Sequence, residues 1–240
     1  MVGCAVASIL MAPVVTPGLC PANDWYCGKY ITNRSHDIEL ALQEHISLTV
    51  GGVLIGLVVA FGLALVARRA KWLEAVILGG STVLYTIPSL ALLAFLVPIV
   101  GLDQSRTAVL IGLVIYSLVV LVRAFVTGLR GVPADAVEAA RGMGFGPTRL
   151  LFRVELPLAL PTIMAGLRVA TVSTVAMTTL GVVVDHGGLG NLLDEALARS
   201  YRFEALTAAV LCVALAIVAD LLLVGIQWLL SPWRRKAAAR

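Results

Sequence analysis

The most constraining feature of this chain is a series of five long apolar runs between Ile46 and Leu230. They cover residues 46–67, 73–100, 107–127, 161–184 and 205–230. A helix of about 20 apolar residues, rising about 1.5 Å per residue, crosses the hydrocarbon core of a bilayer, which is about 30 Å thick. Since 60% of the residues are hydrophobic and the mean hydropathy is +0.97, a single membrane domain is expected. The sequence therefore predicts an all-α integral membrane protein whose membrane domain covers residues 46–231.

The segment before the first clear run, residues 1–45, is predicted to be extracytoplasmic or interfacial. Residues 1–20 are apolar but lack a basic start and contain prolines, so they make a poor signal peptide. That stretch is barely long enough to cross the membrane, and a sixth span within it stays open. Residues 37–46 predict an amphipathic helix on the membrane surface. Cys20 and Cys27 would form a disulfide in an oxidising compartment, and two unpaired cysteines are an equal alternative.

The basic residues of the loops orient the predicted spans. An excess of Lys and Arg marks the cytoplasmic side of a membrane protein. Eleven such residues fall on the side of the loop between the third and fourth spans: Arg68, Arg69, Lys71, Arg130, Arg141, Arg149, Arg153, Arg234, Arg235, Lys236 and Arg240. Five fall on the other side: Lys29, Arg34, Arg106, Arg199 and Arg202. The loop and the basic tail, residues 232–240, are therefore predicted to be cytoplasmic. The net charge of +4 is small and its residues are dispersed, so no nucleic-acid partner is expected.

The long hydrophilic interruption of the apolar body, residues 132–165, holds the first functional candidates. Pro133 can open a helical turn. Asp135, followed three residues later by Glu138, has the form of an N-terminal capping box in which Asp replaces Ser or Thr. These residues predict a short helix exposed to water.

The end of that helix is equally marked. Gly142 and Gly144 predict that it stops within about three turns, and a second helical run over 148–155 leads into the fourth span. A short helix with alanines and a glycine-rich end suits docking into a groove of a partner protein. A solvated loop without a partner is the equal alternative.

The spacing within this loop follows a fixed pattern: Glu138-Ala139-Ala140, three residues, Gly144, nine residues, then Val154-Glu155-Leu156-Pro157. It resembles the EAA signature of permease subunits of binding-protein-dependent ABC importers, with Val154 in place of the usual isoleucine. The resemblance implies a type I ABC importer permease fold, in which residues 138–144, including Arg141 and Gly142, form a coupling helix that docks on an ATPase. It also implies that Glu138 caps and orients the helix, that Ala139 and Ala140 permit close approach, and that Gly144 makes a sharp turn.

The second apolar run contains the segment Tyr85-Thr-Ile-Pro88-Ser89-Leu-Ala-Leu-Leu. Pro88 removes a helical hydrogen bond and Ser89 can compensate a freed carbonyl, so a kinked or broken helix is predicted. A structural bend and the lining of a transport pathway are equal alternatives. The segment is similar to Q-T-I-P-S-L-A-L-L of osmoprotectant importer permeases, which serve glycine betaine, carnitine and choline. Tyr85 departs from the family's Gln, which exchanges an amide for a phenol.

The turn after the fourth span, His186-Gly187-Gly188-Leu-Gly190, resembles the same subgroup and is predicted to belong to the pathway or its outer gate. Asp185 and His186 stand where the family has small residues, and would alter the contacts of this turn with the outer gate or with a binding protein. The three histidines show no paired ligand spacing, so no metal site is expected.

Glycines and charges within the spans give two further expectations. Gly51, Gly52 and Gly56 in the first span, and Gly62 after them, predict close helix packing. The ionisable residues inside the spans are Arg123, Arg168 and Asp220. The arginines either snorkel toward the cytoplasmic side, or one of them pairs with Asp220.

Enzymatic signatures are missing from the sequence: it contains neither a phosphate loop of the form G-x4-G-K-[ST] nor a recognisable catalytic triad. No catalytic residues and no cofactor are therefore predicted in this chain. ATP and Mg²⁺ are expected on partner ATPase subunits. The resemblance further implies a second permease subunit, identical or related, and an extracytoplasmic substrate-binding protein, all at a bacterial cytoplasmic membrane.

The substrate implied by the resemblance is a quaternary ammonium osmolyte such as glycine betaine, choline or carnitine. Another small solute, for example an amino acid derivative, is the alternative within the same class. A stand-alone secondary transporter would show internal repeats and charges near the bilayer midplane, and the sequence shows neither. A membrane scaffold without transport is a third class, in which the loop would bind no ATPase.

Overall fold

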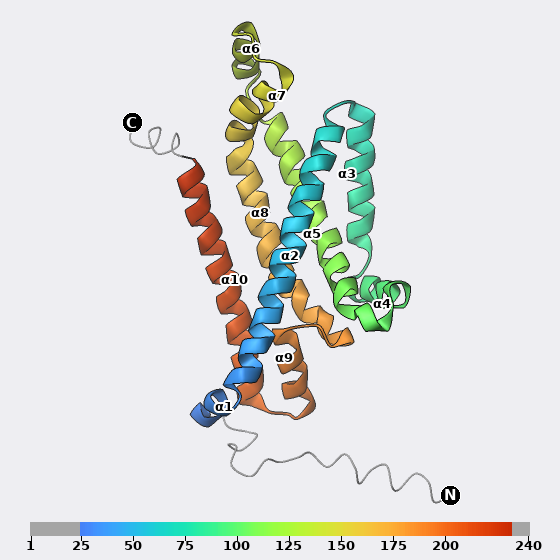
Figure 1. Cartoon of the computed structure of the whole chain (residues 1–240), viewed down its shortest axis with the longest axis vertical. Coiled ribbons are helices and arrows are strands. Elements are labelled where there is room, and N and C mark those ends of the chain that lie inside the picture. The colour runs from blue at the N-terminus through green and yellow to red at the C-terminus, as the bar shows by residue number, and fades with distance from the viewer. Residues whose placement is uncertain (1–24, 232–240) are drawn as a thin grey trace, which may run out of the picture.

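The computed structural model describes residues 25–231 and shows an elongated set of helices (Figure 1). In chain order the elements are α1 (Gly28–Asn33), α2 (Ser35–Ala67), α3 (Lys71–Thr86), α4 (Ser89–Val100), η1 (Leu102–Gln104), α5 (Ser105–Arg130), α6 (Ala134–Gly142), α7 (Pro147–Leu150), η2 (Leu151–Glu155), α8 (Leu156–Thr178), η3 (Thr179–Val184), α9 (Leu189–Ala198) and α10 (Arg202–Leu230). The predicted all-α fold is confirmed for this part of the chain. A sixth span within residues 1–20, the pairing of Cys20 with Cys27 and the basic tail lie outside the described residues.

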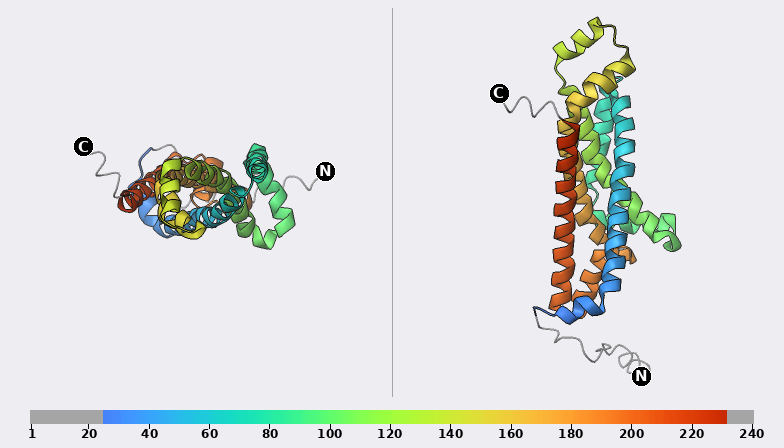
Figure 2. Two further views of the ribbon diagram at one scale, coloured as in Figure 1. Left: turned by 90° about the horizontal axis from the view of Figure 1, so that it is seen from above. Right: turned by 60° about the vertical axis from the view of Figure 1, so that its left-hand side comes forward.

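Four stretches of the described chain are long and apolar enough to cross a membrane unaided: α2, α5, residues 147–184 and α10. The fifth predicted span, 73–100, is not one rod, because α3 and α4 meet at an angle of 95°. Pro88 explains the break, since its ring holds the preceding Ile87 in an extended conformation, with ψ at 123°. Figure 2 shows α4 projecting sideways from the bundle as a result.

A hydroxyl group stabilises this break, although it is not the one that the sequence suggested. The carbonyl of Ile87 accepts a hydrogen bond from the hydroxyl of Tyr116 on α5. Ser89, predicted to compensate a freed carbonyl, makes no such bond within the described residues, and that prediction is wrong. The donor comes from a distant part of the chain, so local sequence could not identify it.

The first span also begins earlier than predicted. α2 starts at Ser35, so residues 37–46 are the first turns of a membrane-crossing helix and not a separate helix on the membrane surface. His45 and Leu48 in these turns are buried, and Leu48 packs against Val109 and Leu113 of α5. This packing extends the helix through the boundary predicted at residue 46.

The core lies where α2, α5 and α8 pack side by side. Its buried members are small or branched, among them Ala60, Leu121, Phe125, Ile163 and Ala170. Gly52 and Gly56 lie directly against Leu113 and Ser117 of α5, and Gly51 lies close to Leu110, so the predicted close packing is confirmed for these three glycines. A side chain at Gly62 would meet nothing within 4 Å among the described residues, so the prediction is wrong there. The Ser117 hydroxyl also donates to the carbonyl of Gly52, at 3.1 Å.

The fourth span is longer than predicted. Helix continues from Pro147 through a wide π-turn at η2 and into α8, passing both Pro157 and Pro161. Pro157 is the second residue of α8 and follows the π-turn directly. The prediction that the run 148–155 leads into the fourth span is therefore confirmed.

The molecule has two distinct ends. In Figure 1, α6 and α7 stand at one extreme, and α1 and α9 lie at the other. The α2–α3 connection lies toward the α6 end, whereas α4 branches off nearer the α9 end (Figures 1 and 2). We call these the loop end and the outer end.

Candidate coupling loop and outer-end sites

The α6 helix stands clear of the bundle at the loop end (Figure 2). It begins at Ala134, with Pro133 in the N-cap position at φ −56° and ψ 131°, and no side chain caps it. Asp135 lies in the first turn, where its charge favours the helix dipole without capping the helix. The predicted capping box, and with it the capping role of Glu138, is therefore wrong: Pro133 occupies the cap, two residues before Asp135.

The C-terminal end of α6 turns sharply at Gly144. This glycine has φ of 82°, a left-handed conformation that side chains beyond glycine rarely adopt. The N–H of Gly144 donates to the carbonyl of Arg141 at 2.9 Å, and the N–H of Phe145 donates to that of Ala140 at 3.1 Å. Gly144 thus reverses the chain toward α7.

The two alanines of the motif face different ways. Ala139 is exposed, together with Glu138, Arg141 and Gly142, whereas Ala140 is only 1% exposed and packs within its own chain. Successive residues of a helix point about 100° apart, so both alanines cannot share one face. Close approach by a partner is thus open to Ala139 but not to Ala140, contrary to the role expected of Ala140.

The base of the loop is fastened to the bundle through Glu155 of the motif and Arg68, a pairing that the sequence did not predict. Glu155 of η2 is 6% exposed, and its Oε2 atom lies 2.5 Å from Nη2 of Arg68, which comes directly after α2. Nearby, the ring of Phe152 lies 6.4 Å from that of Phe61 on α2. Leu156 and Pro157, predicted as part of the motif, are half-buried just beyond Glu155. Arg68 contributed only to the charge count of the loops, because nothing in the sequence joins it to Glu155.

The glycine-rich turn lies at the outer end and is buried. A side chain at Gly188 would meet the backbone of His45 on α2, at 2.8 Å from its nitrogen, and Gly187 and Gly190 pack equally closely against η3. The turn is fixed by the amide of Asn191, whose Oδ1 accepts from the N–H of Gly187 at 2.9 Å. The glycines therefore permit close packing of η3 and α9 on α2.

His186 beside this turn has an acidic partner. Its Nδ1 atom lies 2.7 Å from Oε1 of Glu44 on α2. Within residues 25–231 no group of three or more His, Cys, Asp or Glu side chains is arranged to hold a metal ion.

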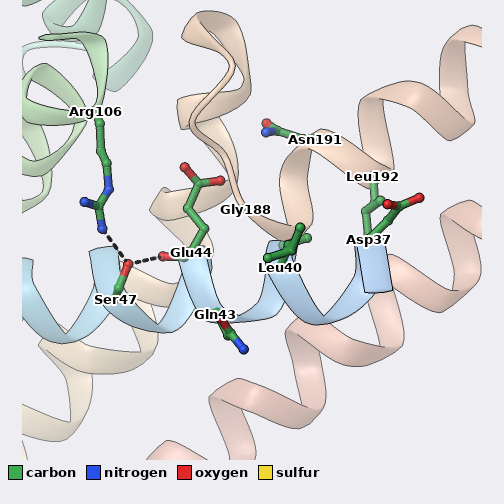
Figure 3. Close-up of a pocket in the computed structure, with 10 residues that line it drawn as sticks. Asp37, Leu40, Gln43, Glu44, Ser47, Arg106, Gly188, Asn191 and Leu192 are labelled. Atoms are coloured by element: carbon green, nitrogen blue, oxygen red, sulfur yellow. Dashed lines mark hydrogen bonds between the residues drawn. The ribbon is translucent and has the colours of Figure 1, made fainter. Parts of the chain in front are cut away.

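An open pocket of about 650 Å³ lies next to the same turn (Figure 3). It is lined from α2, α9 and the start of α5, and its polar members include Asp37, Gln43, Glu44, Ser47, Arg106 and Asn191. Arg106 donates to the hydroxyl of Ser47 at 2.9 Å, and that hydroxyl donates to the carbonyl of Glu44 at 2.8 Å. The pocket is therefore a polar depression at the outer end.

A charge cluster around Arg34 ties the outer ends of the helices together. Its guanidinium donates to Asp37 at 2.9 Å, to Glu195 of α9 at 3.1 Å and to Glu204 of α10 at 3.0 Å. Burial lowers the pKa of Arg34, but the hydrogen bonds to Glu195 and Asp37 outweigh it, so its pKa is raised overall. Arg34 therefore stays charged throughout the physiological range.

The aromatic side chain next to this cluster is fully buried. Tyr30 packs edge-on against Tyr201 and Phe203, with ring centroids 5.6 and 5.8 Å away. Burial raises the pKa of the Tyr30 phenol above its ordinary value, and the charge of Glu204 raises it further. Tyr30 therefore remains neutral and anchors α1 to the start of α10.

The remaining pathway candidates lie at the α3–α4 break. The side chain of Tyr85 is 55% exposed, and its ring lies 5.9 Å from that of Tyr116 in an edge-on arrangement. Ser89 lines a narrow cleft together with Leu93, Met177 and Leu180. Leu180 belongs to η3, which leads into the glycine-rich turn, so the structure brings Ser89 close to that segment while Tyr85 faces outward.

The bundle combines one broken span, a protruding hydrophilic helix at one end and a polar depression at the other, an arrangement expected of a transport permease. The family model described as "Binding-protein-dependent transport system inner membrane component" matches residues 52–236. This chain belongs to that family.

Several relatives are similar over most of their length. The chain is 35% identical over 204 residues to the choline transport system permease protein OpuBB of Bacillus subtilis, covering 85% of this chain and 93% of the relative. It is 30% identical to the carnitine transport permease protein OpuCB of Listeria monocytogenes, covering 85% and 92%. It is 34% identical to the osmoprotectant import permease protein OsmW of Salmonella typhimurium, covering 85% and 96%.

Solved structures show the same fold. An inward-facing form of the MetNI methionine ABC transporter matches with a TM-score of 0.68 at 20% identity, covering 79% of this chain and 94% of the matched chain. An amino acid ABC transporter matches with a TM-score of 0.66 at 20% identity, covering 87% and 98%. The type I ABC importer permease fold expected from the sequence is thus confirmed.

Proposed function

We propose that this chain is the permease subunit of an ATP-driven importer of quaternary ammonium osmolytes such as choline, carnitine and glycine betaine. The observation that carries the substrate is the similarity to three permeases named for choline, carnitine and osmoprotectant transport, each matched over more than nine tenths of its length. A second support is the segment around Pro88, which follows the osmoprotectant pattern and breaks the second span. Tyr85 is the position at which this chain departs from that pattern.

The energy would come from a separate ATPase, which would bind ATP and Mg²⁺. In this proposal α6 is the coupling helix: its exposed face, with Glu138, Ala139, Arg141 and Gly142, would sit in a groove of the ATPase. Two permease chains, identical or related, would carry two such helices. Closure of the ATPase pair on ATP would draw the helices together and open the pathway outward, and hydrolysis would reset it.

The loop end would face the cytoplasm and the outer end would meet a substrate-binding protein. The distribution of basic residues supports this orientation, because Arg68, Lys71 and Arg130 lie at the loop end with the α6 segment. The binding protein would supply most of the substrate recognition, since a quaternary ammonium group is held through cation–π attraction in an aromatic cage.

The test is uptake of labelled glycine betaine, choline and carnitine in a strain without its own osmolyte uptake. The chain would be expressed with its ATPase and binding protein, beside a Gly144→Asp variant. Because Gly144 has φ of 82°, an aspartate there strains the turn and misplaces α6, so uptake and co-purification of the ATPase should both be lost.

The matched control is Gly146→Asp. Gly146 lies in the same loop, has φ of −69° and has free space around it, so the same charge should leave uptake intact. If no osmolyte enters although the ATPase co-purifies, the substrate assignment is wrong and the importer class stands. If Gly144→Asp leaves uptake and ATPase binding unchanged, the coupling role of α6 is wrong.

A further inference from the structure

The last part of the loop motif contains Glu155, whose buried carboxylate has a single cationic partner among the described residues. Glu155 and Arg68 lie 2.5 Å apart, with 8% and 38% of their side chains exposed. Removing one partner of such a pair leaves the buried charge without compensation. The pair is also a bridge, because Glu155 belongs to the loop segment and Arg68 to the end of α2.

The backbone at Glu155 is unusual in a way that makes this contact. Residues 151–155 form a π-turn, the wide helical turn that inserts one residue into an otherwise α-helical path. One inserted residue rotates the later residues of the helix by about 100° around its axis. The π-turn therefore sets which side of the helix Glu155 occupies, and the ion pair shows that this side faces the end of α2.

A second contact reinforces the same link. Phe152, in the same π-turn, lies against Phe61, and Phe61 lies 5.5 Å from Phe125 of the central helix α5. The ion pair places a buried charge next to its partner, and the tilted rings pack apolar surface beside it. The loop is thus attached to α2 at two neighbouring points.

The helix that receives this contact reaches the other end of the molecule. α2 is unbroken over 33 residues, about 50 Å at about 1.5 Å per residue. Its outer turns supply Leu40, Glu44 and Ser47 to the outer pocket, as Figure 3 shows. Rigid secondary elements are among the structures that carry coupling between distant sites.

We propose that Arg68 and Glu155 are positioning residues whose ion pair transmits movement of the α6 loop to α2, and so to the outer pocket. This inference rests on the proposed function, because it needs an ATPase that moves the loop. The ion pair is the specific contact through which the loop moves α2. Without the pair, the ATPase still hydrolyses ATP but moves α2 less.

The experiment uses the complex of this chain with its ATPase and second permease chain, reconstituted in vesicles with the binding protein and glycine betaine. The first readout is the amount of solute imported per ATP hydrolysed. Glu155→Gln and Arg68→Gln should each lower this ratio by about fivefold or more while ATP hydrolysis continues. Arg68→Lys keeps the cation and should retain most of the ratio.

The matched control is Glu74→Gln. Glu74 pairs with Arg130 at 2.5 Å at the same end of the molecule, but this pair joins α3 to α5 and does not touch the loop. Its removal should leave the ratio unchanged. Equal losses from Glu74→Gln and Glu155→Gln would show a general structural effect and overturn the inference.

The second readout does not depend on the solute. A cysteine at Leu40, whose side chain is 51% exposed on the outer part of α2, is treated with a membrane-impermeant maleimide with and without ATP and Mg²⁺. The chain without the Leu40 cysteine measures background labelling. Labelling of the Leu40 cysteine should change with nucleotide when Glu155 is present, and this change should be lost in Glu155→Gln.

The outcomes separate the two proposals. If the unmodified complex imports none of the three osmolytes, the substrate assignment is wrong, and the ion pair is judged on labelling alone. If Glu155→Gln does not assemble, Arg68→Gln, on the more exposed side of the pair, supplies both readouts. A ratio and a nucleotide-dependent labelling that both survive loss of the pair overturn the inference.

Discussion

Arg168 and Asp220 form a paired charge between two apolar helices. Nε and Nη2 of Arg168 donate to the two carboxylate oxygens of Asp220, each at 2.7 Å, which joins α8 to α10. The sequence left this pair and a snorkelling arginine as alternatives, and the structure confirms the pair. A two-pronged contact of this kind fixes orientation as well as neutralising charge.

We expect charge reversal at either residue to lower the yield of folded protein, because two like charges would then meet within apolar surroundings. Combining Arg168→Asp with Asp220→Arg restores an opposite-charge pair, so the double variant should recover the yield of folded protein that each single variant loses. The measurement is the fraction that elutes as one species after detergent extraction. A double variant that behaves no better than the single ones would show that the pair does not support folding.

Two glycines differ in how closely another helix approaches them, so replacing each with alanine should change the free energy of unfolding in opposite directions. A methyl group at Gly166 of α8 would collide with the Cβ atom of Ala124 on α5, whereas one at Gly62 of α2 would meet nothing within 4 Å. Gly166→Ala should therefore lower the free energy of unfolding by about 1–3 kcal/mol. Gly62→Ala should raise it by about 0.5–1 kcal/mol through helix propensity. Thermal unfolding in detergent compares them, and shifts of the same sign would contradict this account.

Among the elements, the broken span depends on a hydrogen bond from outside it. The hydroxyl of Tyr116 satisfies the carbonyl of Ile87 at the α3–α4 break, and Tyr116 is 8% exposed. Loss of one partner of a buried hydrogen bond leaves the other unsatisfied.

Tyr116→Phe should therefore destabilise the protein by about 1–3 kcal/mol. Tyr85→Phe is the control, since the hydroxyl of Tyr85 makes no hydrogen bond within the described residues and its ring stays in contact with Tyr116. Melting temperatures in one detergent provide the comparison. Equal effects of the two substitutions would mean that the hydroxyl of Tyr116 does not hold the break.

The sequence predicted elements well where the cause is local. The break at Pro88 results from a missing N–H, and the turn at Gly144 results from the left-handed conformation that glycine permits. The π-turn at 151–155 was not predicted, because no residue type marks a π-turn as proline marks a break. The capping box was wrong because the cap position is Pro133, two residues earlier than the pattern assumed.

Contacts between residues far apart in the chain could not be predicted from the sequence. Glu155 and Arg68, and likewise His186 and Glu44, meet only because helices far apart in the chain pack together. The roles of Ala139 and Ala140 differ for a simpler reason. Helical geometry alone separates their directions, although the two residues are adjacent in the motif.

For the whole molecule, the proposed orientation predicts opposite labelling of the two ends. A cysteine replacing Ala139, exposed on α6, should react with an impermeant maleimide only after cells are permeabilised. A cysteine replacing Leu40, exposed at the outer end, should react in intact cells. The reverse pattern would invert the orientation and place α6 where no cytoplasmic ATPase can reach it.

The distance between α6 and the outer pocket has an evolutionary consequence. No described residue belongs to both sites, and the helices between them carry the ordinary packing of a bundle (Figure 1). Under the proposed function, substitutions that adapt the outer end to a new substrate-binding protein need not disturb the docking of the ATPase on α6. Related permeases can therefore keep the same ATPase while their substrate-binding proteins diverge. A chimaera of two permeases joined across the middle of the helices should take its ATPase from one parent and its substrate-binding protein from the other.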